Sequence, residues 1–364
     1  MDRRLFMKRA AGATAGAAAA TTLAAPAIAQ GVKDLVIVST WPRDFPGLGI
    51  PAQRLAARIG ELTDGRYNVQ YFAAGERVGA FDSFDEVASG NAQAYIGADY
   101  YWIGKHPGWA PFTAIPFGLT YTEIDAWMQF AGGRELHEEI GAEFGIMPMA
   151  CGNTGVQMGG WFNKEINSVD DLKGLKMRIP GQGGDVMAKL GVSTVALPGG
   201  QIYENLVSGA IDATEWVGPF NDYFLKLYEA AKYYYWPGMH EPGAQLSIGF
   251  NKAFWDGLPK LDQQIIRAAA AEENGKTMAE TNANNGAYLT RLVNDHGVQL
   301  REFNDDVYAA FGGAAQEVLE TARGHSDLAA RIMDSVVQAR KEIGAWTALS
   351  DMAYVQKRNK VLGN

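Results

Sequence analysis

The chain contains two successions of short apolar strands and amphipathic helices, and this repetition limits the folds open to it. Leu35–Val38 is a continuous apolar run, typical of a strand buried on both faces of a largely parallel sheet. Apolar residues at helical spacing follow over 52–62, and further strands are predicted over 69–72 and 92–96. This order predicts an α/β unit with right-handed crossovers, in which ligand sites lie at the carboxyl ends of strands.

A second unit follows Phe162 and lies inside the chain. Its expected strands cover residues 175–179, 195–197, 211–213 and 233–236. Leu246–Asn251 then resembles a strand that returns to the first unit. Two crossings between the units would form a hinge around a cleft, which is the arrangement of two-lobed binding proteins.

The C-terminal part is expected to be helical, because apolar residues recur at three-and-four spacing over 261–295, 305–323 and 327–361. We expect these helices to brace both units. The last one is alternatively a dimer contact, and its apolar stripe does not decide between the two uses. The expected division is lobe I (30–152 plus about 243–285), lobe II (153–242) and a helical C-terminal region (about 286–364).

The first 29 residues resemble an export signal. Arg3 and Arg4 precede an Ala-rich run over 10–25, Ala27–Ala29 has the pattern of a cleavage site, and twin arginines are typical of the Tat route. A membrane anchor is the weaker interpretation, because the run is short and rich in Ala. No later stretch has the roughly 18 uninterrupted apolar residues of a spanning helix. The sequence therefore predicts a periplasmic protein.

The net charge argues against polyanionic partners. The chain has 32 Lys and Arg against 41 Asp and Glu, a net charge of −9. Without the first 29 residues, which carry four basic residues and one acidic residue, the net charge becomes −12. Nucleic acid and anionic membranes are therefore not expected partners, and an anionic ligand needs a local positive site. The only cysteine, Cys151, is expected to be a small buried hydrophobic residue.

Arg178 ends a predicted strand, with Pro180 two residues later. Arginine grips a carboxylate through two parallel hydrogen bonds and keeps its charge. An isolated arginine is ordinarily a surface or structural ion pair, but the carboxyl end of a strand favours binding. Tyr101, in an aromatic loop after the strand at 92–96, is either part of a packed corner or a neighbour of the ligand.

Glu215 follows another short strand of the second unit. A carboxylate near Arg178 would repel an anionic ligand unless a cation lay between them. Gln157 offers an amide oxygen, Trp216 its backbone carbonyl and Glu241 a second carboxylate, and oxygen donors suit Na⁺ or Ca²⁺ rather than zinc. Alternatively, Glu215 simply pairs with Arg178, and composition alone leaves both interpretations open.

The sequence does not match the common cofactor-binding and catalytic motifs. The glycine-rich segment 181–185 is not G-x-G-x-x-G, because Val186 stands where the third glycine should be. The five histidines lack metal-ligand spacing, and no G-x-S-x-G elbow is present. A binding protein without enzymatic activity is therefore predicted.

Residues 153–162, 174–178 and 211–219 resemble the extracytoplasmic solute-binding subunits of TRAP transporters. The branch they match best binds 2-oxo acids such as pyruvate, or 2-hydroxy acids such as lactate, together with a metal ion. The resemblance extends over essentially the whole chain after the leader. It implies a two-lobed, venus-flytrap α/β fold with long C-terminal helices. The residues it places at the ligand are Arg178, which clamps the carboxylate, with Gln157, Asn153, Tyr101 and Trp216 around it.

The same resemblance implies a metal site. Its ligands would be the side chains of Gln157, Glu215 and Glu241 and the carbonyl of Trp216. One departure concerns the residues beside Glu241: His240 and Pro242 stand where an aromatic residue and a glycine are expected.

We therefore expect a periplasmic subunit that captures a small 2-oxo monocarboxylate, with Na⁺ or Ca²⁺, for the membrane subunits of a Na⁺-driven transporter. The alternatives are a 2-hydroxy acid as ligand, a sensing subunit, or an exported metal-dependent enzyme acting on 2-oxo acids. A 2-oxo or 2-hydroxy acid offers a cation two oxygens in a five-membered chelate, whereas acetate lacks the second oxygen.

Overall fold

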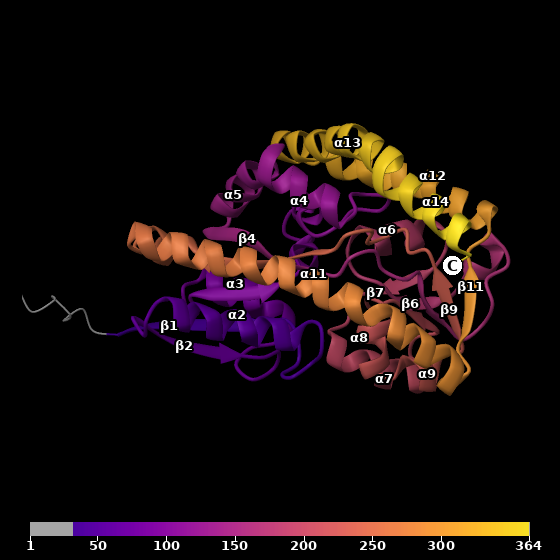
Figure 1. Ribbon diagram of the computed structural model, residues 1–364, viewed down its shortest axis with the longest axis horizontal. Helices are drawn as coiled ribbons and strands as arrows, with labels where there is room; N and C mark the ends of the chain where they lie inside the picture. Colours follow the sequence, from indigo (N-terminus) through magenta and orange to yellow (C-terminus); the bar gives the residue numbers. More distant parts are fainter. Residues whose placement is uncertain (1–31, 364) are drawn as a thin grey trace, which may run out of the picture.

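The computed structural model describes residues 32–363, so the predicted export signal at 1–29 lies outside the described residues. The described part contains two mixed sheets, each with helices packed around it, placed side by side along the long axis of the molecule (Figure 1). The α/β fold predicted from the sequence is confirmed. None of the helices in residues 32–363 has the length and apolar character needed to cross a membrane.

The first sheet has the strand order β2-β1-β3-β10-β4. Its strands are β1 (Lys33–Ser39), β2 (Tyr67–Phe72), β3 (Ala94–Gly97), β4 (Ile146–Asn153) and β10 (Gln245–Asn251). β1 pairs in parallel with β2 and β3, whereas β10 runs antiparallel to both β3 and β4. The return strand expected at 246–251 is thus β10, inserted between two strands that precede it by about 100 residues or more in the chain.

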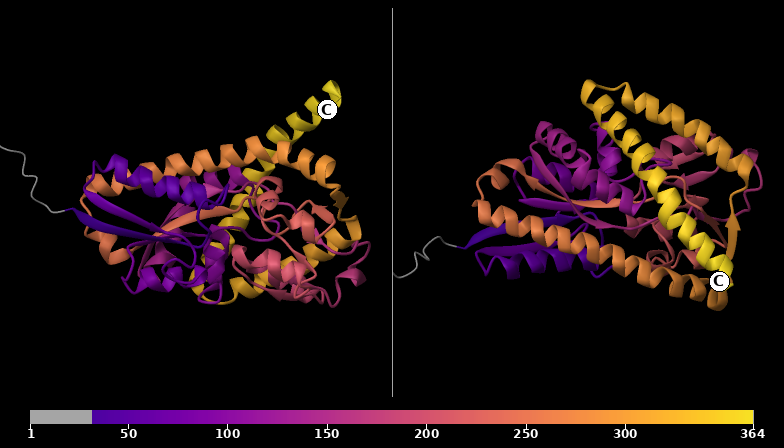
Figure 2. Two further views of the ribbon diagram at one scale, coloured as in Figure 1. Left: turned by 90° about the horizontal axis from the view of Figure 1, so that it is seen from below. Right: turned by 45° about the horizontal axis from the view of Figure 1, so that its top comes forward.

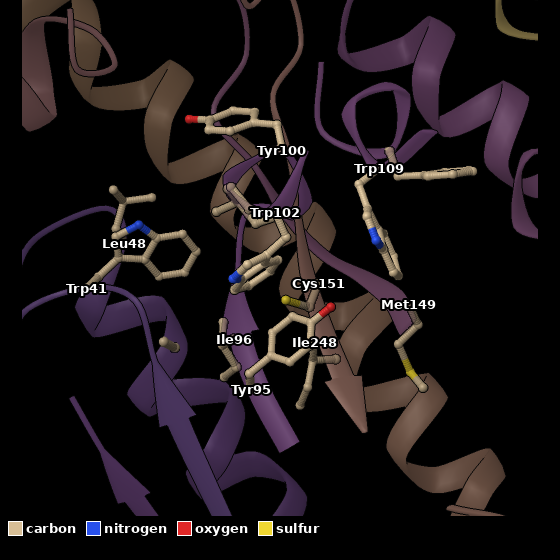
Figure 3. Packing of buried hydrophobic residues seen from close by; sticks show 14 of the residues in the cluster. Trp41, Leu48, Tyr95, Ile96, Tyr100, Trp102, Trp109, Met149, Cys151 and Ile248 are labelled. Atoms are coloured by element: carbon tan, nitrogen blue, oxygen red, sulfur yellow. The ribbon is translucent and has the colours of Figure 1, made fainter. Parts of the chain in front are cut away.

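Helices and short turns surround this sheet. The helices are α2 (Gly49–Leu62), α3 (Ser83–Ala88), α4 (Tyr121–Phe130), α5 (Gly133–Glu143) and α10 (Lys252–Asp256), and 3-10 turns cover Ala80–Asp82, Asp99–Trp102 and Pro107–Phe112. Aromatic and aliphatic side chains fill the space between them. Figure 3 shows Tyr95, Trp102 and Ile248 packed around Cys151, which is buried as expected.

The second sheet has the order β11-β9-β5-β8-β6-β7. Its strands are β5 (Gly160–Phe162), β6 (Lys176–Arg178), β7 (Ser193–Val195), β8 (Ala213–Thr214), β9 (Tyr233–Trp236) and β11 (Gln299–Glu302). The helices of this part are α6 (Gly181–Lys189), α7 (Gly199–Val207), α8 (Pro219–Phe224) and α9 (Leu227–Ala230), with a 3-10 turn at Val169–Leu172. β6 runs parallel to β7 and β8, so the residues that follow β6 and β8 emerge at one edge.

The chain passes between the two sheets three times, not twice as expected. The crossings are β4 to β5, β9 to β10, and the long helix α11 (Lys260–His296), which leads into β11. α11 packs against β4 and α2 beside the first sheet and against α8 beside the second. The helical pattern after residue 286 did not predict β11, because four mostly polar residues carry no strand signal of their own.

The remaining helices lie over both sheets. They are α12 (Asp305–Arg323), α13 (Asp327–Thr347) and α14 (Ala353–Leu362), with a π-helical turn at Ala348–Met352 between the last two. α12 packs on α6, whereas α13 packs on α4 and α5. These helices therefore brace the two parts, as expected, and α14 projects from the body of the molecule (Figure 2).

Candidate functional site

The candidate residues come from segments that join the two sheets. Arg178 ends β6, and Glu215 and Trp216 follow β8, so parallel pairing of these strands places all three together. Gln157 lies in the crossing from β4 to β5, and Glu241 lies in the crossing from β9 to β10. The site is therefore built on these two crossing segments, here called the hinge segments, and on one edge of the second sheet.

Arg178 and Glu215 form a buried ion pair. The two side chains are 1% and 0% exposed, and Nη1 of Arg178 donates a short hydrogen bond to Oε1 of Glu215. The same nitrogen donates to the Glu215 carbonyl at 3.0 Å, and Nε donates to the Leu197 carbonyl at 3.1 Å. Burial alone would lower the pKa of Arg178, but Glu215, Tyr101, Tyr100 and Glu241 together outweigh burial and raise the pKa above its ordinary value. Of the two roles that the sequence left open for Glu215, the structure shows the pairing with Arg178.

Glu241 occupies the opposite side of the same cluster and is bound to Gln157. Nε2 of Gln157 donates to Oε2 of Glu241 at 2.6 Å and to the Thr154 hydroxyl at 2.9 Å. The backbone N–H of Gln157 donates to the Glu241 carbonyl at 3.0 Å, which ties the two hinge segments together. Burial and the nearby Glu215 carboxylate raise the pKa of Glu241 to about 8.

Trp216 covers the guanidinium of Arg178. The centre of the guanidinium lies 5.2 Å from the indole centroid, within the range of a cation–π contact. The indole also packs edge-on against Phe45, which belongs to the first part of the chain, at 6.1 Å between ring centroids. Gly199 lies against this ring, where an added Cβ would come within 2.4 Å of it. Trp216 thus packs against residues of both parts of the molecule, Phe45 in the first and Gly199 in the second.

A small cavity lies beside this cluster, and neither Arg178 nor Glu215 is among the residues that line it. Its volume is about 10 Å³, which is room for about one water molecule. The residues that line it include Trp41, Tyr100, Tyr101, Thr154, Gln157, Trp216 and Glu241. Tyr101 is therefore placed at the cavity. Asn153 does not line the cavity; its side chain instead donates to the Gly243 carbonyl at 3.2 Å and accepts from the Gly155 N–H at 2.8 Å.

Several buried polar atoms of this cluster have no hydrogen-bond partner within residues 32–363. They are Oε1 of Gln157, Nη2 of Arg178, Oε2 of Glu215, Nε1 of Trp216 and Nε2 of His240. Unpartnered buried polar atoms are costly and rare in proteins. Two of them are oxygens of the residues proposed as cation ligands, and one is an N–H group of the arginine proposed to bind an anion. The donor set therefore fits a cation beside a carboxylate.

Two residues of the cluster were not predicted from the sequence. Tyr100 lines the cavity with Tyr101, and His240 lies 3.3 Å from Glu215, measured between His240 Nε2 and Glu215 Oε2. For His240, the only signal was its position next to Glu241. Neither its burial nor its approach to Glu215 follows from sequence spacing.

Comparison with known proteins identifies the family. The model of bacterial extracellular solute-binding protein, family 7, matches residues 38–324, so the chain belongs to this family of solute-binding proteins. It is 40% identical, over 318 residues and 87% of each chain, to a monocarboxylate 2-oxoacid-binding periplasmic protein of Nostoc sp.. This family membership and the two-sheet fold agree with the resemblance seen in the sequence.

Two solved structures are similar over most of the chain. One is a TRAP periplasmic solute-binding protein from Colwellia psychrerythraea with bound calcium and pyruvate, which is 39% identical with a TM-score of 0.86. The other, from Pseudoalteromonas atlantica with bound sodium and pyruvate, is 37% identical, also with a TM-score of 0.86. Each comparison covers 89% of this chain, and 99% and 98% of the respective structures.

Proposed function

We propose that this protein captures a small 2-oxo monocarboxylate of the pyruvate type in the periplasm, together with Na⁺ or Ca²⁺. It would pass the ligand to the membrane subunits of a TRAP transporter. The buried Arg178–Glu215 pair carries the proposal, because it lies at the junction of the two parts and leaves one N–H group and one carboxylate oxygen unpartnered within the described residues. The relatives with bound pyruvate and calcium or sodium support this choice.

The carboxylate and the cation would be bound by different residues of the site. Arg178 would bind the ligand carboxylate through Nη1 and Nη2, which requires Glu215 to give up its hydrogen bond to Nη1. Glu215, Glu241, Gln157 and the Trp216 carbonyl would hold the cation, which supplies the positive charge that Glu215 then lacks. Tyr101 and Trp216 would flank the alkyl end of the ligand. The Asn153 side chain would act by fixing the hinge segment that carries Gln157.

The second oxygen of the ligand distinguishes it from simpler acids. Pyruvate offers the cation a carboxylate oxygen and the C2 oxygen, and acetate offers only the first. Lactate has the same two positions and is the alternative ligand. The family and the Nostoc relative are solute-binding proteins, so we propose binding without turnover. Incubation with pyruvate should therefore return it unchanged.

Thermal unfolding of metal-stripped protein tests this proposal. Pyruvate should raise the unfolding temperature only when Na⁺ or Ca²⁺ is present, and ligand at about 100 times its dissociation constant should add about 2.7 kcal/mol. Acetate with the same cation is the control. Equal stabilisation by acetate and pyruvate would contradict the chelate, and no response to any 2-oxo or 2-hydroxy acid would contradict the function.

We also propose that a second copy of the chain covers the projecting C-terminal helix. The exposed apolar side chains of the π-helical turn and α14 are Leu349, Met352, Tyr354, Val355, Val361 and Leu362. Apolar side chains gathered on one exposed helix are typical of an interface. Sedimentation of wild-type protein and of a chain ending at Thr347 should give a dimer and a monomer, respectively; a monomeric wild type would contradict this proposal. We further propose that the two lobes meet near residues 153 and 243, where the chain crosses from one sheet to the other.

A further inference from the structure

His240 is buried within the acidic part of the site although sequence spacing gave it no role. Its side chain is 3% exposed, and Nε2 lies 3.3 Å from Oε2 of Glu215. The two atoms are close enough to attract each other, yet neither has a hydrogen-bond partner within the described chain. An imidazole nitrogen that is buried, unpartnered and next to a carboxylate oxygen needs a physical explanation.

The backbone around His240 leaves room for this placement. Gly183, in the first turn of α6, faces it: an added Cβ at Gly183 would come within 2.6 Å of the His240 Cβ. A side chain at position 183 would therefore displace His240 from the cleft. Gly183, in the glycine-rich segment 181–185, thus lets the imidazole approach Glu215.

Three side chains here are arranged as metal donors. One donor atom each from Glu215, His240 and Glu241 lie within 4.8 Å of one another, and all three residues are buried. Oxygen atoms of two carboxyl groups and an imidazole nitrogen thus converge on one point, as the ligands of a metal ion do.

We propose that His240 is a nitrogen ligand of the cation site, so that the site also binds borderline divalent cations such as Mn²⁺ and Co²⁺. This rests on the proposed function, because it concerns the same cleft. Carboxylate, amide and carbonyl oxygens suit Na⁺ and Ca²⁺, whereas an imidazole favours first-row transition metals. His240 would then set which metal the site selects.

Metal binding by the metal-stripped protein tests this without any transport assay. Pulsed EPR of bound Mn²⁺ should show nitrogen hyperfine coupling in the wild type. The coupling should be lost in His240→Phe, which keeps an aromatic ring but has no nitrogen, and also in the smaller His240→Gln, which guards against misfolding of the first variant. His325→Gln removes an exposed histidine that lies beside His106, at 4.8 Å between ring centroids, and should keep the coupling.

Metal affinities show whether His240 binds the metal directly or only orients Glu215. The Co²⁺ affinity of His240→Phe should fall at least about 100-fold, because even residues that only orient metal ligands contribute about 10- to 100-fold. The Ca²⁺ affinity should change far less. Equal losses for both cations, or no nitrogen coupling in the wild type, would overturn the inference even if pyruvate still binds with Ca²⁺. Nitrogen coupling without any response to pyruvate would support His240 as a ligand and contradict the proposed solute instead.

Discussion

Arg178 and Glu215 neutralise each other in a site from which water is almost completely excluded. A buried ion pair of this kind adds little net stability compared with apolar packing, but removal of one partner leaves a costly unpaired charge. Each of the two charges would be unfavourable in this buried site without the other. In the proposed complex, Arg178 would bind the ligand carboxylate and Glu215 would bind the cation.

Replacement of Arg178 by Ala should destabilise the ligand-free protein by about 3–5 kcal/mol, because Glu215 remains buried without its partner. The variant should not respond to pyruvate. Added Ca²⁺ should recover part of the lost stability, since it supplies the positive charge that Glu215 lacks. Denaturant unfolding with and without Ca²⁺ measures these effects.

Arg301→Ala is the matched control. Arg301 pairs with Glu165 at 2.7 Å in the same part of the chain, but both side chains are partly exposed to solvent. Its loss should cost at most about 1 kcal/mol and leave pyruvate binding unchanged. Pyruvate binding by Arg178→Ala at wild-type affinity would contradict the assignment of this residue.

Replacement of Glu215 by Gln should abolish the dependence of pyruvate binding on the cation. The amide keeps the shape of the side chain but removes the charge that attracts the cation and that repels an anion near Arg178. Calorimetric titration of pyruvate with and without Ca²⁺ should therefore give the same weak affinity. A cation effect as large as that of the wild type would show that Glu215 is not a ligand.

The sequence predicted the parts of the site that follow from strand ends. Arg178 ends β6 and Glu215 directly follows the parallel strand β8, so the α/β pattern alone placed them near each other. β4 was not predicted, because Pro148 interrupts it and the run carries few β-branched residues. β7 begins two residues before the predicted strand. Short strands of this kind form through pairing with their neighbours rather than through their own preferences.

The residues that sequence reasoning missed depend on contacts between distant segments. His240 enters the cluster because Gly183, 57 residues earlier in the chain, leaves space for it. Asn153 was expected beside the ligand from its position in a motif, and this role stays a prediction; its side chain bonds the backbone of Gly243 and Gly155, a contact that the motif did not predict. Neither relationship has a periodic signature in the sequence.

Asp222 should make the stability of the protein fall as the pH rises from about 4 to about 6. Burial raises the pKa of Asp222 from an ordinary value of 3.8 to about 6, so the folded protein retains a proton that the unfolded chain releases in this range. The stabilising contribution is complete below pH about 4 and is lost as the pH passes about 6. The difference in unfolding free energy between wild type and Asp222→Asn should show this slope.

The same carboxyl fixes the segment after Trp216. Oδ1 accepts hydrogen bonds from the N–H groups of Val217 and Gly218, and Oδ2 accepts from Trp161 and Tyr234. Asp222→Asn should therefore also weaken cation binding by loosening the Trp216 carbonyl. A difference between wild type and variant that is flat or rises between pH 4 and 6 would contradict the raised pKa.

Gly181 should matter for closure around the ligand, whereas Gly174 should matter only for folding. Both have left-handed backbones, with φ of +65° and +76°, so Ala at either position should cost about 1–2 kcal/mol through strain. A Cβ at Gly181 would come within 3.2 Å of the Tyr100 ring, which belongs to the other part of the chain, and a Cβ at Gly174 would meet no atom within 4 Å. Calorimetry should therefore show weaker pyruvate binding for Gly181→Ala alone, because only this variant separates Tyr100 from the start of α6. Equal affinities of the two variants would mean that this contact does not contribute to the closed form.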